Sequence, residues 1–195
     1  MERRALLKGH ELRVDRQEGR AARIAGMSIV YDSLSEDLGG FRERVAQGAA
    51  RAALEADVRA LLNHDPSLVL GRTAAGTLRL SEDARGLAFE FDVPDTSVGR
   101  DLVVSVERRD ITGVSFAFRT LKDAWNRVGG EWLRTLLDIE IRDISPVTFP
   151  AYPAASLGMR ALGDDGEALA GLRAAEAVED RRRRLTRLAE LDAGG

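Results

Sequence analysis

The chain has 195 residues, of which 44% are hydrophobic and 31% charged, and its formal net charge is −3 at pH 7. This balance is typical of a soluble globular protein with one substantial core, and the weakly acidic total argues against a general nucleic-acid binder. The chain has no cysteine, which excludes disulfides, thiolate zinc sites and a cysteine nucleophile together.

Neither a membrane nor a nucleic acid is an expected partner. No apolar run approaches the roughly 18 residues that a membrane span requires, and the charged start at residues 1–4 predicts no secretory signal peptide. Four consecutive arginines at 181–184 are flanked by acidic residues on both sides. We interpret them as the solvated, salt-bridged face of a helix rather than a nucleic-acid site.

Composition divides the chain into three parts. Residues 1–21 are dense in charges of both signs and are predicted to form an arm, and residues 22–161 form the main domain. Residues 162–195 begin with a Gly/Asp linker at 163–166 and continue as a segment rich in Ala, Leu, Arg and Glu, which predicts a helical tail.

Short strand-like runs dominate the main domain. An Ala-rich run at 49–56 predicts a brief helix. Pro66 favours a turn at 64–67, because proline cannot donate to a strand ladder. The predicted strands are 24–31, 41–45, 58–63, 68–72, 77–80, 86–93, 111–119 and 130–149.

One segment changes to a helical period. Val98, Leu102 and Val106 recur at helical spacing after Thr96, a residue type that caps helices, so a helix is predicted over 97–108. The last strand ends in a rigid exit at three prolines, Pro146, Pro150 and Pro153. The whole pattern predicts a mostly β domain with a few helices, of the α+β class.

His64 is the candidate catalytic base. It is one of two histidines, and the other, His10, lies in the charged arm. A serine hydroxyl needs a base within hydrogen-bond reach, and histidine suits that task because its ordinary pKa of about 6.5 is close to neutral. A histidine in a turn is equally compatible with a purely structural role.

Ser115 is the candidate nucleophile. On its predicted strand Val114, Phe116 and Phe118 share one face, while Ser115 shares the other with small residues that leave room for a substrate carbonyl. A plain strand serine bonded to backbone would give the same pattern.

Asp143 is the candidate third member. By strand parity it falls on the apolar face with Ile139 and Ile141, unless a bulge resets the register. A buried carboxylate needs a partner, and a histidine ring N–H is a natural one; a strand-end cap, or a pair with Arg142 or Arg134, is the alternative. One core histidine with scattered carboxylates has no metal-ligand spacing, so neither a metal nor a cofactor is predicted.

Several motifs follow one another in a recognisable order between residues 22 and 161. The two most specific are residues 113–118, Gly-Val-Ser-Phe-Ala-Phe, and residues 143–153, Asp-Ile-Ser-Pro-Val-Thr-Phe-Pro-Ala-Tyr-Pro. The others are 26–31, 37–43, 47–49, 62–65, 69–72, 76–80 and 86–87. In wording and order, these motifs resemble the HK97-type prohead maturation proteases of tailed bacteriophages.

The resemblance implies a serine endopeptidase that acts inside the assembling prohead, in the host-cell cytoplasm. Such an enzyme removes the scaffolding segment of the major capsid protein, usually cleaves itself, and is thought to share the herpesvirus assemblin β-barrel ringed by helices. Its partners would be the capsid protein and its scaffolding segment, with self-association a further expectation. We also predict that the tail helps to hold the enzyme in the head and is removed or mobile in the mature particle; a tail packed permanently on the barrel is the alternative.

Carried across residue by residue, the resemblance makes His64 the general base and Ser115 the nucleophile. Asp143 stands where relatives commonly have glutamate, and Arg134 matches a basic position that would either support an oxyanion or neutralise carboxylates. Two other readings stay open: a catalytically silent capsid-assembly domain of the same fold, and a different barrel hydrolase with the same nucleophile. The intact trio favours an active enzyme.

Overall fold

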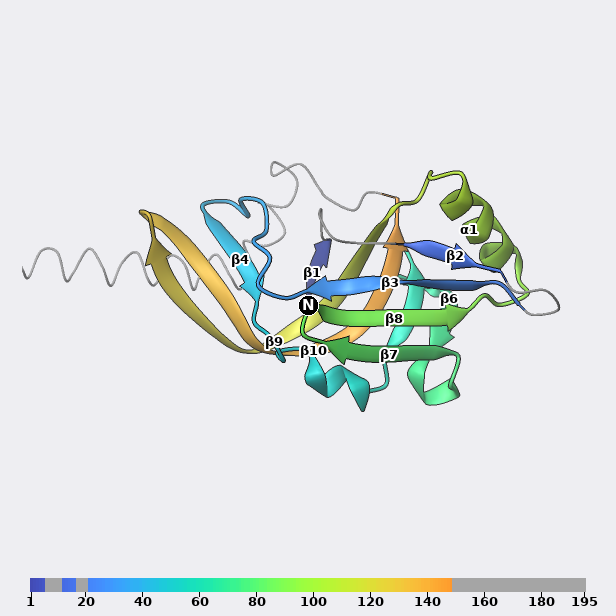
Figure 1. The fold of residues 1–195 in the computed structure, drawn as a ribbon, viewed down its shortest axis with the longest axis horizontal. Helices are drawn as coiled ribbons and strands as arrows, with labels where there is room; N and C mark the ends of the chain where they lie inside the picture. The colour runs from blue at the N-terminus through green and yellow to red at the C-terminus, as the bar shows by residue number, and fades with distance from the viewer. Residues whose placement is uncertain (6–11, 17–20, 149–195) are drawn as a thin grey trace, which may run out of the picture. The chain divides into compact units, whose positions relative to one another are not determined.

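Two β-sheets face each other in the computed structural model, which describes residues 1–5, 12–16 and 21–148 (Figure 1). The larger sheet runs in the order β1, β9, β10, β5, β6, and β4 also pairs with β10. The smaller sheet runs in the order β2, β3, β8, β7. The predicted linker and tail at 162–195 lie outside the described residues.

The elements have the following bounds. The larger sheet contains β1 (Glu2–Ala5), β4 (Phe41–Val45), β5 (Arg59–Leu62), β6 (Asp65–Arg72), β9 (Gly113–Val128) and β10 (Glu131–Val147). The smaller sheet contains β2 (Arg13–Asp15), β3 (Arg23–Val30), β7 (Leu78–Asp83) and β8 (Gly86–Asp92). The helical elements are α1 (Ser97–Glu107) and the single 3-10 turns η1 (Arg51–Leu54) and η2 (Thr73–Ala75).

The long antiparallel hairpin of β9 and β10 organises the larger sheet. It turns at Gly129-Gly130, where both glycines have positive φ. Along its other edge β10 pairs in parallel first with β4 and then with β5. β10 therefore pairs with its hairpin partner β9 and with two strands from much earlier in the sequence, β4 and β5. Figure 1 shows β4 beside the half of the hairpin that extends beyond the smaller sheet.

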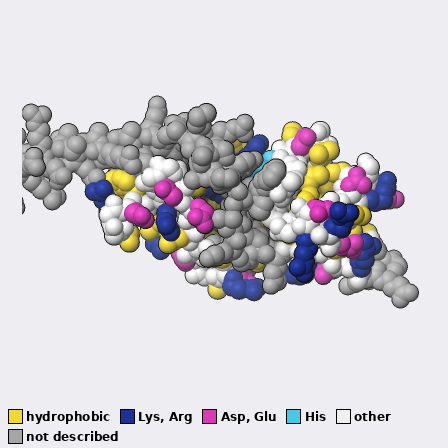
Figure 2. All heavy atoms as spheres, turned by 90° about the horizontal axis from the view of Figure 1, so that it is seen from above, with side chains coloured by type: hydrophobic (Ala, Val, Ile, Leu, Met, Phe, Trp, Pro, Cys, Tyr) yellow, Lys and Arg dark blue, Asp and Glu magenta, His cyan; other side chains and the backbone are white. Residues whose placement is uncertain are grey.

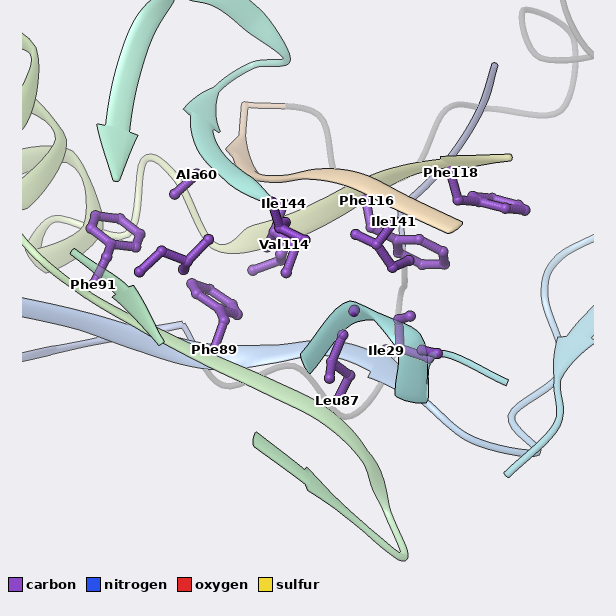
Figure 3. Packing of buried hydrophobic residues seen from close by; sticks show 14 of the residues in the cluster. Ile29, Ala60, Leu87, Phe89, Phe91, Val114, Phe116, Phe118, Ile141 and Ile144 are labelled. Carbon is purple, nitrogen blue, oxygen red and sulfur yellow. The ribbon is translucent and has the colours of Figure 1, made fainter. Parts of the chain in front are cut away.

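The core lies between the two sheets. Val114 and Phe116 of β9 and Ile144 of β10 point toward Leu87 and Phe89 of the smaller sheet (Figure 3), and all five are almost completely buried. Burial of such side chains is the main stabilising term for a domain of this size. This packing leaves the opposite face of β9, which carries Ser115, for other uses.

Most predicted elements are confirmed. Strands occur at or near every predicted range, and Thr96 caps α1 by accepting a hydrogen bond from the backbone N–H of Gly99 at 3.2 Å. The mixed class with mostly strands is also confirmed. The charged arm at 1–21 was not predicted to contain strands, yet its residues 2–5 and 13–15 form β1 and β2, one in each sheet.

Two local predictions were wrong. The helix predicted at 49–56 is only the short 3-10 helix η1, whereas Pro146 lies within β10, inside the strand predicted over 130–149. The turn between β5 and β6 is Asn63-His64, so Pro66 belongs to a strand. That strand is the last in its sheet, where a missing N–H is tolerated.

The surface carries both signs of charge. Figure 2 shows basic and acidic side chains interspersed over the coloured part of one face, as expected from a net charge of −3. Within residues 1–5, 12–16 and 21–148, no helix is long and apolar enough to cross a membrane.

Gly99 gives a test of the packing of α1. Alanine normally stabilises a helix relative to glycine by about 1 kcal/mol, but a Cβ at this position would lie 2.2 Å from the Pro94 carbonyl oxygen. We expect Gly99→Ala to lower the free energy of unfolding by about 1–3 kcal/mol, because backbone must move. Urea unfolding measures this change. Val104→Ala, at an exposed position of the same helix, should stay within about 0.5 kcal/mol of wild type, and a stabilised Gly99→Ala would contradict the packing.

Candidate active site

His64 lies at the tip of the β5–β6 hairpin. Leu62 pairs with Asp65, so the loop has two residues, Asn63 and His64, whose φ values are +53° and +58°. Two positive φ values are the feature of the tight type I′ hairpin, a conformation that glycine adopts freely and that carries strain for other residues. The tip is anchored to the end of β10, because the Asn63 N–H donates to the Pro146 carbonyl at 3.0 Å and the Asn63 side-chain oxygen accepts from the Thr148 N–H at 2.9 Å.

A bulge in β10 determines where Asp143 points. The register against β9 shifts between Ile141 and Asp143, so Arg142 is the extra residue and is exposed. Asp143 then lies opposite Ala117, while Ile141 and Ile144 lie opposite the two phenylalanines of the core face. The bulge that the sequence analysis left open is therefore present, and it moves the carboxylate from the core face to the face of Ser115.

Ser115 lies in the middle of the larger sheet. It pairs with Ser145 of β10 on one side and with Ala5 of β1 on the other, and it is only 3% exposed. Its Oγ lies 3.0 Å from the Arg4 carbonyl oxygen, within hydrogen-bond distance. The small residues on this face of β9 leave the hydroxyl accessible to groups from β1 and from the hairpin tip.

The fold brings all three predicted residues together. His64 Nδ1 lies 2.6 Å from Asp143 Oδ1, and His64 Nε2 lies 2.6 Å from Ser115 Oγ. An ionised carboxylate can only accept, so Nδ1 donates to Asp143 and Nε2 is left to accept from the serine hydroxyl. The arrangement is that of a nucleophile, a base and a group that orients the base.

Burial strengthens the electrostatic interaction between His64 and Asp143. The side chains of His64 and Asp143 are 7% and 11% exposed, so their mutual interaction is poorly screened by water. Ser145, completely buried, donates a second hydrogen bond to Asp143 Oδ1 at 2.8 Å. Sequence reasoning missed Ser145, although its spacing of two residues from Asp143 on one strand was the available signal.

A buried cluster of charges lies beside the site. Arg134 donates to Glu2 at 2.7 Å, to Glu43 at 3.1 Å and to Asp123 at 2.7 Å. Burial alone would lower the pKa of Arg134, but its bonds to Glu2 and the charge of Glu43 raise it instead. Arg134 therefore neutralises carboxylates, which was one of the two roles that the sequence suggested for it.

Glu43 and Arg4 are two members of this cluster that sequence reasoning missed. Arg4 donates to both carboxylate oxygens of Glu43, at 2.7 and 3.1 Å. The signal for Glu43 was its position between Phe41 and Val45 on one face of a short alternating strand, where a glutamate is out of place.

No group of three or more His, Cys, Asp or Glu side chains in the described ranges is arranged to hold a metal ion. The aligned histidine and serine can carry out proton transfer and nucleophilic attack by a hydroxyl.

Glu2 gives a pH test of the charged cluster. Burial opposes its ionisation, but hydrogen bonds from Arg134 and Thr120 and the charge of Arg4 lower its pKa from 4.5 to about 2. Because the folded-state pKa is depressed, the stabilisation is present above pH 4.5 and is lost as the pH falls toward 2, by roughly 3 kcal/mol at most. Urea unfolding between pH 5 and 2.5 should show a smaller pH dependence for Glu2→Gln than for wild type. Identical pH dependence in the two proteins would contradict the cluster.

Comparison with known proteins gives one match. A family model described as caudovirus prohead serine protease matches residues 10–164, which include all three residues of the site. No curated protein and no solved structure matches the chain. A match over most of the chain, with the serine, histidine and aspartate described above inside it, shows that this chain belongs to the caudovirus prohead serine protease family.

Proposed function

We propose that Ser115, His64 and Asp143 are the catalytic residues of this family member, and that it removes the scaffolding segment of the major capsid protein and cleaves itself. Family membership supports a protease role in capsid maturation. The single observation that supports the catalytic assignment is the unbroken hydrogen-bonded chain from Asp143 through His64 to the Ser115 hydroxyl.

The chemistry follows from that chain of hydrogen bonds. His64 Nε2 takes the proton of the Ser115 hydroxyl as Oγ attacks the carbonyl carbon of a peptide bond, and Asp143 stabilises the imidazolium that forms. The protonated ring then gives this proton to the leaving amine, and the C–N bond breaks to leave an ester on Ser115. Water hydrolyses the ester with His64 again as base, which regenerates the hydroxyl.

The wider setting of the enzyme is also part of the proposal. The two facing sheets with few helices are compatible with an assemblin-like barrel, and we propose that fold for this chain. Family membership supports action inside the assembling prohead in the host cell, with the capsid protein as partner.

A catalytically silent capsid-assembly domain is the second candidate. The free-energy cost of the strained backbone and buried polar groups at the site argues against a silent domain. His64 has a strained positive φ, and Asp143 and Ser145 are buried polar groups whose alignment would serve nothing in a silent domain.

Removal of the nucleophile or the base should stop capsid processing. We expect co-expression of Ser115→Ala or His64→Ala with the major capsid protein to leave that protein at full length, as measured by intact mass. The double variant should be about as inactive as either single one, because the members of such a unit fail non-additively. Ser28→Ala is the matched control, since Ser28 is a buried serine bonded to the Leu87 carbonyl in the smaller sheet. Normal processing by Ser115→Ala would contradict the mechanism.

Asp143→Asn should reduce activity far more than stability. The amide keeps the shape of the carboxylate but favours the wrong histidine tautomer, and in a well-studied triad the same change costs about ten-thousand-fold in rate. The initial rate of capsid cleavage measures the effect, with Asp138→Asn, at an exposed position of the same strand, as control. A loss below roughly tenfold would mean that Asp143 is structural.

A further inference from the structure

Strand β1 lies on the edge of β9 that carries the nucleophile. It pairs antiparallel, with Glu2 opposite Phe118, Arg4 opposite Phe116 and Ala5 opposite Ser115. Because β1 is the outermost strand of its sheet, without it the edge of β9 would present unpaired N–H and C=O groups beside Ser115. An extended peptide binds to such an edge by adding a strand.

The backbone of β1 already places a carbonyl group at the nucleophile. Ser115 Oγ lies 3.0 Å from the Arg4 carbonyl oxygen and 2.6 Å from His64 Nε2, both of which can accept its hydrogen. The hydroxyl has one hydrogen, so the carbonyl and the imidazole compete for it. In a reactive complex other donors hold the carbonyl oxygen and the carbonyl carbon faces Oγ. β1 therefore occupies the edge of β9 beside Ser115, which we call the substrate groove, in a pose that is not cleaved.

The side chain of Arg4 lies against Glu43 and Phe118, which we call the acidic pocket. Its guanidinium forms two hydrogen bonds with the Glu43 carboxylate and lies 5.6 Å from the centre of the Phe118 ring. Glu43 is only 3% exposed, and its position is fixed because β4 pairs with β10 at Arg134. Two parallel hydrogen bonds to a carboxylate select a guanidinium by shape as well as by charge.

When β1 leaves the pocket, the buried Glu43 carboxylate requires another cation as a partner. Arg134 contacts Oε2 of Glu43, whereas Oε1 accepts from Arg4. A neutral side chain in place of Arg4 would leave one oxygen of a buried carboxylate without a charged partner, which is costly in a site that excludes water.

We propose that the substrate polypeptide binds along β9 in the place of β1, and that Glu43 selects arginine or lysine at the residue whose carbonyl carbon Ser115 attacks. The peptide bond that breaks is the one that follows this basic residue, and its amine takes the proton from His64. This inference rests on the proposed function. β1 is then a substrate-like strand that competes with peptides for the groove.

Two fluorogenic peptides test the pocket. The first is acetyl-Glu-Arg-Arg-aminomethylcoumarin, which repeats residues 2–4, and the second replaces the last arginine by norleucine. We expect kcat/KM of the full chain to be about 100-fold higher for the arginine peptide, a ratio typical of a buried ion pair. Glu43→Gln should reduce the ratio to below about tenfold through a loss on the arginine peptide alone.

Labelling of Ser115 by a fluorophosphonate separates the two levels of the proposal, because this probe requires no basic side chain. Equal rates on the two peptides, or turnover of neither by a chain that labels, would overturn the pocket and leave the catalytic site standing. Failure of Ser115 to label in the wild-type chain would overturn the proposed function itself.

The same probe tests the competition by β1. Arg4→Ala removes the bond to Glu43 and should raise the rate of labelling of Ser115 at least about tenfold, because β1 leaves the groove more often. Arg3→Ala is the matched control, since the neighbouring Arg3 is exposed. Equal labelling rates for the two variants would overturn the assignment of β1 as the strand that occupies the substrate groove.

Discussion

The buried carboxylate of Asp143 is the constraint on which the site depends. A carboxylate on the core face of β10 would be too costly to keep, and the bulge at Arg142 turns it to the face of Ser115. There it accepts hydrogen bonds from His64 and Ser145. These two bonds satisfy the charge and, in doing so, fix the ring of His64 in the tautomer that leaves Nε2 toward the serine.

The sheet topology explains why three distant residues meet. β10 pairs with β9, which carries Ser115, and on its other edge with β5, which leads into the hairpin tip of His64. The bonds from Asn63 to Pro146 and Thr148 hold that tip against the end of β10. The base is therefore held by backbone geometry on a rigid element, and not by a loose loop.

Much of this could be predicted from the sequence, and the failures have physical causes. The strands and the capped helix α1 follow from local alternation, turn residues and Thr96, which depend on neighbours along the chain. The bulge at Arg142 depends on the partner strand, so the sequence could offer it only as an alternative to the core face for Asp143. The positive φ of His64 displaced the predicted turn, because tertiary anchoring tolerates local strain that propensity disfavours.

The charged arm shows the same limit. Glu2 and Arg4 look like solvated residues in the sequence, because their partners Glu43 and Arg134 are contributed by strands far along the chain. Only pairing of β1 with β9 brings these charges together beside the nucleophile. Strand β9 thus contributes to both features: Ser115 to the catalytic chain of hydrogen bonds, and Phe118 to the contacts of Arg4 in the acidic pocket.

The most direct test of the account is the site and rate of modification by a fluorophosphonate, followed by peptide mass mapping. The account predicts a single adduct on Ser115, formed at least about 100-fold more slowly in His64→Ala, since the imidazole is the base that activates the hydroxyl. An adduct on another serine, or a labelling rate of Ser115 that does not depend on His64, would contradict it.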